Sequence, residues 1–134
     1  MAAVKAFFAG FLATIVFHQP MLFLLQLAGL TTRAPYAMQA VPPFGVPAVI
    51  SLAFWGGVWG ILLWLVIRRR SNSSYWTITL LFGAIAPTLV AGLVVAPLKH
   101  QATPRTWQLI VLGLAVNAAW GLGTAVFLRL FRAK

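Results

Sequence analysis

Residues 46–67 read VPAVISLAFWGGVWGILLWLVI and are followed at once by Arg68-Arg69-Arg70. The stretch contains no charged side chain, while a proline-rich segment precedes it and three arginines follow it. An α-helix needs about 20 mainly apolar residues to cross a hydrocarbon layer roughly 30 Å thick. This stretch therefore predicts a transmembrane helix.

Three further stretches have the same character, at residues 6–30, 76–98 and 107–128. Of the 134 residues, 62% are hydrophobic and 7% are charged, against roughly 25% charged in a soluble domain. Alternating strand patterns are absent, and in lipid the backbone must satisfy its own hydrogen bonds. We therefore expect an all-α integral membrane protein, a four-transmembrane-helix bundle forming a single domain over residues 1–134. The first span lacks a small-residue cleavage site, which favours a retained helix over a signal peptide.

The charge composition excludes several kinds of chemistry. The chain has ten Lys and Arg, no Asp or Glu and no Cys, giving a formal charge of +10. Without carboxylates there is no paired-acid hydrolase, no Asp-oriented serine triad and no carboxylate calcium or magnesium site. We expect no catalytic residue, no metal site and no enzyme. Because the basic residues flank apolar segments, their expected partner is the anionic headgroup layer, not nucleic acid.

The distribution of basic residues predicts the orientation of the chain. Seven fall on one side of the four spans and three on the other, the three being Arg33, Lys99 and Arg105. Because cytoplasmic loops carry the excess of Lys and Arg, both termini and the Arg68-Arg69-Arg70 turn are predicted to be cytoplasmic. We expect a multi-pass protein of a bacterial inner membrane.

An internal repeat is suggested by the pattern A-P-x-x-x-Q-A-x-P, which occurs at residues 34–42 and 96–104. Each copy is followed by a helix containing Trp-Gly, at residues 55–56 and 120–121. Chance in an alanine- and proline-rich chain is the alternative. The interpretation as a duplication predicts two tandem helical hairpins, residues 1–70 and 71–134, related by a pseudo-twofold axis along the membrane normal. The matching loops supply a candidate outer-loop site at Gln39, His100 and Gln101.

A candidate polar site lies near the middle of the first span, at His18 and Gln19. Pro20 removes a backbone donor and is expected to free the carbonyl of Val16. Ala6, Gly10, Thr14 and His18 are spaced by four, which predicts that His18 lies on a packing face. A histidine at this depth either binds a ligand or haem or transfers a proton, or it makes a structural hydrogen bond to a neighbouring helix or to the freed carbonyl. Because the other histidine, His100, lies in an outer loop, haem would need His18 from two copies or from a partner chain.

The other candidate residues are small or polar positions at helical spacing. Asn117 shares one face of the fourth span with Gly113 and Gly121, and Gly56 and Gly60 form a GxxxG motif in the second. Such faces let backbones approach closely while a polar side chain bonds across. Asn117 joins His18 and Gln19 as a candidate midplane group, and the glycines are candidate packing residues.

Three functions remain open from the sequence. The first is an oligomeric transport or channel module for a neutral or anionic solute, and the second is a non-catalytic accessory subunit of a larger membrane complex. The third is a haem- or quinone-binding protein that uses His18. The outer segment 31–47 is expected to be stiff, because four of its residues are prolines. It either covers the end of the bundle as a lid or rests on the membrane surface.

Overall fold

The computed structural model describes residues 1–99 and 107–133. The candidate outer-loop residues His100 and Gln101 lie outside this part of the chain. The described elements are α1 (Ala2–Ala13), the π-helix η1 (Thr14–His18), α2 (Gln19–Leu27), β1 (Ala40–Val41), β2 (Val46–Pro47), α3 (Ala48–Ile67), α4 (Asn72–Val90), the π-helix η2 (Ala91–Val95), α5 (Ala96–Leu98) and α6 (Trp107–Leu130).

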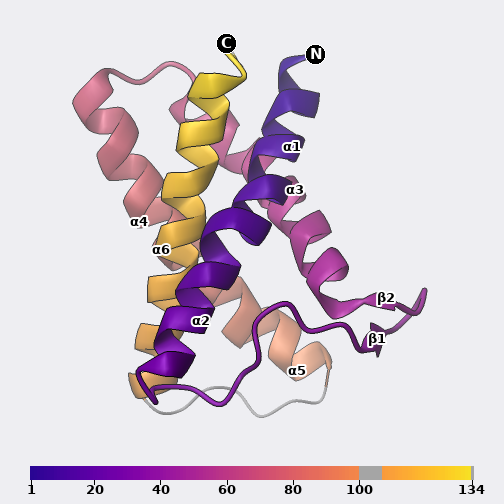
Figure 1. The fold of residues 1–134 in the computed structure, drawn as a ribbon. Coiled ribbons are helices and arrows are strands. Elements are labelled where there is room, and N and C mark those ends of the chain that lie inside the picture. The colour runs from indigo at the N-terminus through magenta and orange to yellow at the C-terminus, as the bar shows by residue number, and fades with distance from the viewer. Residues whose placement is uncertain (100–106, 134) are drawn as a thin grey trace.

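These elements join into four helices that are long and apolar enough to cross a membrane: Ala2–Leu27, Ala48–Ile67, Asn72–Leu98 and Trp107–Leu130. The prediction of four long apolar helices is confirmed. Both termini and the turn between α3 and α4 lie at one end of the molecule, here called the terminal end (Figure 1). The segment carrying the two-stranded antiparallel pair β1–β2 lies at the other, the loop end (Figure 1).

The first span ends earlier than expected, at Leu27 instead of Leu30, and a glycine explains the difference. Gly29 has φ +72°, a left-handed conformation that glycine adopts without steric cost. Its N–H donates to the Gln26 carbonyl at 2.9 Å, and the Leu30 N–H donates to the Leu25 carbonyl at 3.0 Å. This paired pattern is the Schellman motif, which closes a helix and turns the chain away from its axis.

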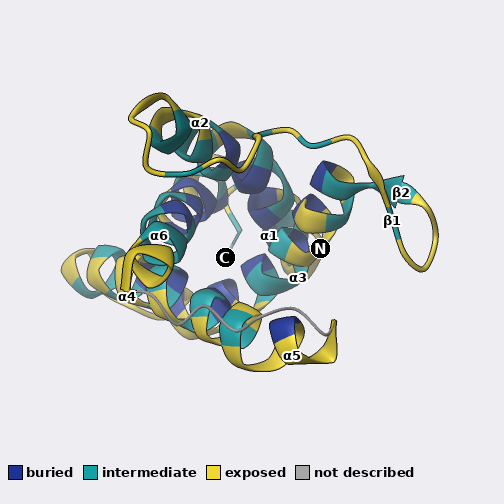
Figure 2. Ribbon diagram, turned by 90° about the horizontal axis from the view of Figure 1, so that it is seen from below, coloured by how far each residue is buried: buried dark blue, intermediate teal, exposed yellow. Residues whose placement is uncertain are grey.

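Glycines let the helices of each hairpin approach closely. A Cβ atom on Gly60 of α3 would lie 2.9 Å from the Cα atom of Gly10 on α1. In the second hairpin, a Cβ atom on Gly83 of α4 would lie 2.7 Å from the Cα atom of Gly121 on α6. The backbones therefore touch where each pair of helices crosses. α1 also packs along α6, which joins the two hairpins into one bundle (Figure 2).

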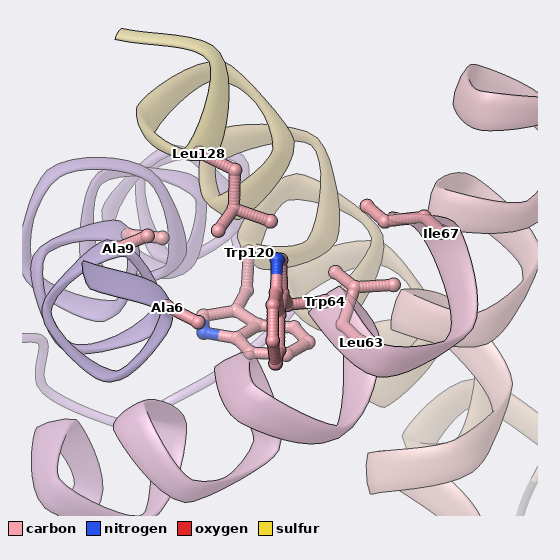
Figure 3. Close-up of a cluster of buried hydrophobic side chains, with 8 residues drawn as sticks. Ala6, Ala9, Leu63, Trp64, Ile67, Trp120 and Leu128 are labelled. Atoms are coloured by element: carbon pink, nitrogen blue, oxygen red, sulfur yellow. The ribbon is translucent and has the colours of Figure 1, made fainter. Parts of the chain in front are cut away.

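A cluster of buried hydrophobic residues lies toward the terminal end, where alanines of α1 meet larger side chains of α3 and α6 (Figure 3). Its labelled members are Ala6, Ala9, Leu63, Trp64, Ile67, Trp120 and Leu128. Burial is unequal among the spans. Within the most apolar 18 residues of each span, 39% are buried inside the molecule for Ala48–Ile67 but only 11% for Asn72–Leu98. The third span therefore lies at the edge of the bundle and directs most of its apolar surface outward.

Candidate functional site at the polar turn of the first span

The polar turn of the first span is a π-helix, in which each N–H bonds five residues back. The N–H of Gln19 donates to the Thr14 carbonyl. In this register the next N–H would serve the Ile15 carbonyl, but residue 20 is proline and has none. The hydroxyl of Tyr36 takes that place and donates to the Ile15 carbonyl at 2.8 Å. The freed carbonyl that finds a partner is thus that of Ile15, not that of Val16 as expected, because the π turn shifts the bonding by one residue.

The same extra residue changes which side chain is buried. Ala6, Gly10 and Thr14 are buried at a spacing of four, as the packing stripe predicts. The next buried position is Gln19, which is 3% exposed, whereas His18 is only half-buried. The next fully buried position of the stripe therefore lies five residues after Thr14, at Gln19, and His18 beside it is partly covered.

Gln19 fixes both the loop and the imidazole. Its Oε1 atom accepts the backbone N–H of Tyr36 at 2.7 Å, and its Nε2 atom lies 3.3 Å from Nδ1 of His18. Since Oε1 faces a donor, Nε2 faces His18 and donates to Nδ1, which requires a neutral imidazole with its proton on Nε2. The turn thus binds Tyr36 through two polar groups, Gln19 and the Ile15 carbonyl.

Tyr36 lies in a strained backbone conformation, with φ +51°. A bulky residue rarely adopts the left-handed region, and such strain persists only where surrounding contacts impose it. Here those contacts are the two hydrogen bonds to the first span. They hold the segment after α2 against the side of the bundle, while β1–β2 projects away from the helices (Figure 2).

Gln39 has a backbone role at the loop end. Its carbonyl accepts the N–H of Ala48 at 2.9 Å, and the Ala37 carbonyl accepts the N–H of Val49 at 3.0 Å. Two of the otherwise unpaired donors at the start of α3 are satisfied in this way. Gln39 is an exposed residue. The structure therefore describes a loop tied to α3 as well as to the first span.

Asn117 lies apart from this turn and bonds to a different helix. Its Nδ2 atom donates to Oγ1 of Thr88 at 2.9 Å, and that hydroxyl donates to the Ala84 carbonyl at 2.6 Å. A Cβ atom on Gly113 would lie 3.1 Å from Cγ2 of Thr88, so the small residue makes room for the threonine. The three candidate midplane residues form two separate sites, one at the polar turn of the first span and one between α4 and α6.

A buried polar contact between α1 and α6 was not predicted from the sequence. Nε1 of Trp120, which is 2% exposed, donates to the Gly10 carbonyl at 3.0 Å, and Oγ1 of Thr14 donates to the same carbonyl at 3.1 Å. A Cβ atom on Gly56 would lie 3.2 Å from Nε1 of Trp120. The indole therefore joins α1, α3 and α6. The only sequence signal was the Trp-Gly pair, which does not distinguish Trp120 from Trp55.

The residues at the turn offer a limited chemistry. Within the described ranges 1–99 and 107–133, no group of three His, Cys, Asp or Glu could hold a metal ion. The single imidazole at this turn, that of His18, already accepts a hydrogen bond from Gln19 and supplies one axial ligand at most. Comparisons with protein-family models, with curated proteins and with solved structures found no match for this chain.

Proposed function

We propose that the chain is a multi-pass integral membrane protein whose terminal end faces the cytoplasm. Its four helices are long and apolar enough to span a bilayer. Large apolar side chains along them point outward, among them Leu24 at 58%, Trp55 at 57% and Leu93 at 66% exposure. The described basic residues at the terminal end are Lys5, the arginines of the α3–α4 turn, Arg129 in the last turn of α6 and Arg132 after it. Such an excess of basic residues favours the cytoplasmic side.

Within the membrane, the role that we propose is that of a non-catalytic accessory module of a larger membrane complex. The observation that carries this proposal is the outward-facing third span, with 11% of its most apolar window buried. The polar residues at the middle of the spans support it. Gln19, Asn117 and Trp120 bond within the chain and hold its helices and loop together. Their donors and acceptors serve structure and do not line a path for a solute.

An oligomeric transport module for a neutral or anionic solute is the second candidate. In a single chain the glycine contacts bring α1 against α3 and α4 against α6, so a solute path would have to form between copies. The exposed third span is the surface on which copies would meet. A haem site, as part of the third candidate function, would require His18 from two copies or from a partner chain, whereas a quinone would need one His18.

Site-specific photo-crosslinking in native membranes tests these proposals. We would place a photoreactive residue at Leu93, which is 66% exposed on η2, and as a matched control at Leu24, which is 58% exposed on α2. An accessory module should give one discrete adduct with a different membrane protein from position 93 and mainly lipid adducts from position 24. An adduct of twice the chain's mass would favour the oligomeric transport module. Lipid adducts alone at both positions would overturn both proposals.

A further inference from the structure

Three helix ends meet around an arginine-lined pocket at the terminal end. The pocket has a volume of about 280 Å³ and lies between the C-terminal ends of α3 and α6 and the start of α4. The polar and aromatic residues that line it are Trp64, Arg68, Arg70, Tyr75, Arg129 and Arg132. We call this the arginine pocket. Its location at one end of all the helices differs from that of the polar turn described above.

The aromatic walls of the arginine pocket are fixed by hydrogen bonds to α6 and to the residues that follow it. Nε1 of Trp64 donates to the Ala133 carbonyl at 3.1 Å, and the hydroxyl of Tyr75 donates to the Ala125 carbonyl at 2.8 Å. These bonds tie α3 to the residues after α6, and α4 to α6 itself. The pocket is therefore built from anchored side chains and not only from flexible surface arginines.

Two of the guanidinium groups are held on these walls. The Arg129 guanidinium lies 4.6 Å from the centre of the Tyr75 ring and 4.8 Å from that of Trp76, and it donates to Oδ1 of Asn72. The Arg68 guanidinium lies 5.1 Å from the centre of the Trp64 ring. Stacking on aromatic faces orients an arginine without neutralising its charge.

The position of Arg132, a further arginine of the pocket, is set by its backbone conformation. Arg132 has φ +47° and occupies the position after α6 that is usually glycine. Its N–H donates to the Arg129 carbonyl at 3.1 Å, and the Ala133 N–H donates to the Leu128 carbonyl at 3.0 Å. This is again a Schellman ending, here formed with a side chain that left-handed backbone disfavours. The chain thus carries an arginine at a position where glycine would fit with less strain.

The charge of the arginine pocket has no acidic side chain to balance it anywhere in the sequence, which contains no Asp or Glu. The described partners of Arg68, Arg70 and Arg129 are aromatic rings, a carbonyl and an amide, all neutral. Four like charges around one pocket repel each other, and the arrangement becomes favourable when an anion enters. Guanidinium groups present planar sets of donors that match phosphate oxygens.

We propose that the arginine pocket binds a phosphate-bearing anion and that its resident ligand is the headgroup of an anionic phospholipid. The pocket lies where the apolar helices end, which is the level of the headgroups in a bilayer. Basic pockets between helices on the cytoplasmic side suit such ligands. The proposal requires insertion in the membrane but is independent of whether the chain acts as an accessory module.

The test uses the full chain in nanodiscs and measures retained lipid by native mass spectrometry. Phosphatidylglycerol is compared with phosphatidylcholine of the same acyl chains, at fixed salt. The test variant is Arg68→Gln with Arg132→Gly. Its control is Arg33→Gln with Lys99→Gln, which removes the same charge from two exposed residues at the loop end. Because glycine suits the backbone of residue 132, the test variant should keep its melting temperature.

The expected result is preferential retention of phosphatidylglycerol by the wild type and the control. In the test variant, retention should weaken roughly 25-fold, about fivefold for each of the two arginines. An equal loss in both variants would show that net charge alone attracts the lipid and would overturn the proposal. Equal retention of the two lipids by the wild type would do the same. If millimolar inorganic phosphate displaces the lipid and gives the same thermal stabilisation, the phosphate site stands but a free phosphate replaces the lipid as its ligand.

Discussion

The close contact between α1 and α3 at Gly60 predicts a specific cost for a single methyl group. In Gly60→Ala, the new Cβ atom would lie 2.6 Å from the Ala6 carbonyl oxygen and 2.9 Å from the Cα atom of Gly10. Ordinary contacts begin near 3.4 Å. Both neighbours are backbone atoms, so no side-chain rotation relieves the overlap. The two helices must separate, and the contacts along their whole crossing weaken.

The magnitude follows from two opposing terms. Overpacking a well-filled contact typically costs about 1–3 kcal/mol. Replacing glycine by alanine inside a helix returns up to about 1 kcal/mol through higher helix propensity. The net expectation for Gly60→Ala is a loss of about 1–2 kcal/mol in the free energy of unfolding. Gly60→Leu should prevent the crossing, because no rotamer places four carbon atoms between touching backbones.

Gly113→Ala provides the matched control. Its Cβ atom would lie 3.1 Å from Cγ2 of Thr88, a side-chain atom, so a small shift makes room. The free energy of unfolding should therefore change by less than about 0.5 kcal/mol, or rise. Both variants would be unfolded with SDS in mixed micelles and followed by circular dichroism. If Gly60→Ala proves as stable as Gly113→Ala, the helices are not in backbone contact at Gly60, and the explanation is wrong.

Three further outcomes are expected. Topology reporters fused after Arg70 and after Lys134 should both report a cytoplasmic location, and a periplasmic signal at either would refute the orientation. Tyr36→Phe removes the donor to the Ile15 carbonyl, so it should lower the free energy of unfolding by about 1 kcal/mol and speed proteolysis of residues 29–47. Unchanged proteolysis would show that the hydroxyl does not hold this segment. Trp120→Phe should lower the free energy of unfolding by roughly 1–3 kcal/mol, because the indole N–H and part of the side-chain volume are lost. Trp55→Phe, at a position 57% exposed, should change it by less than about 0.5 kcal/mol. Equal effects of the two substitutions would contradict the buried role of Trp120.

The number of helices was predictable because it depends on local composition. A run of apolar residues as long as 46–67 has few alternatives to a spanning helix. Helix ends were less accurate, since they depend on backbone conformation at single residues such as Gly29. The proposed duplication of residues 1–70 and 71–134 stays a prediction. Trp55 and Trp120 occupy matching places in it, yet one is 57% and the other 2% exposed.

The polar turn shows why the rest could not be predicted. A spacing of four places His18 beneath Thr14 in an α-helix, but the π-helix inserts a residue and puts Gln19 there. Residues 14–18 contain no signal that predicts a π-helix instead of an α-helix. The hydrogen bonds of this turn depend on Tyr36, which lies 17 positions after Gln19 in the sequence. Pro20 signalled an irregular turn but not its bonding pattern. Side-chain assignment at such a site requires the partner segment as well as the local sequence.

The hydrogen bond between Trp120 and Gly10 has a consequence for the biogenesis of the protein. Its donor and acceptor are separated by 110 positions, so ribosomes synthesise the acceptor long before the donor. The first helix is therefore synthesised before its indole partner. Nascent chains that terminate before α6 therefore lack the contact that joins α1, α3 and α6. Until α6 has been synthesised, α1 and α3 exist without the indole that joins them to it.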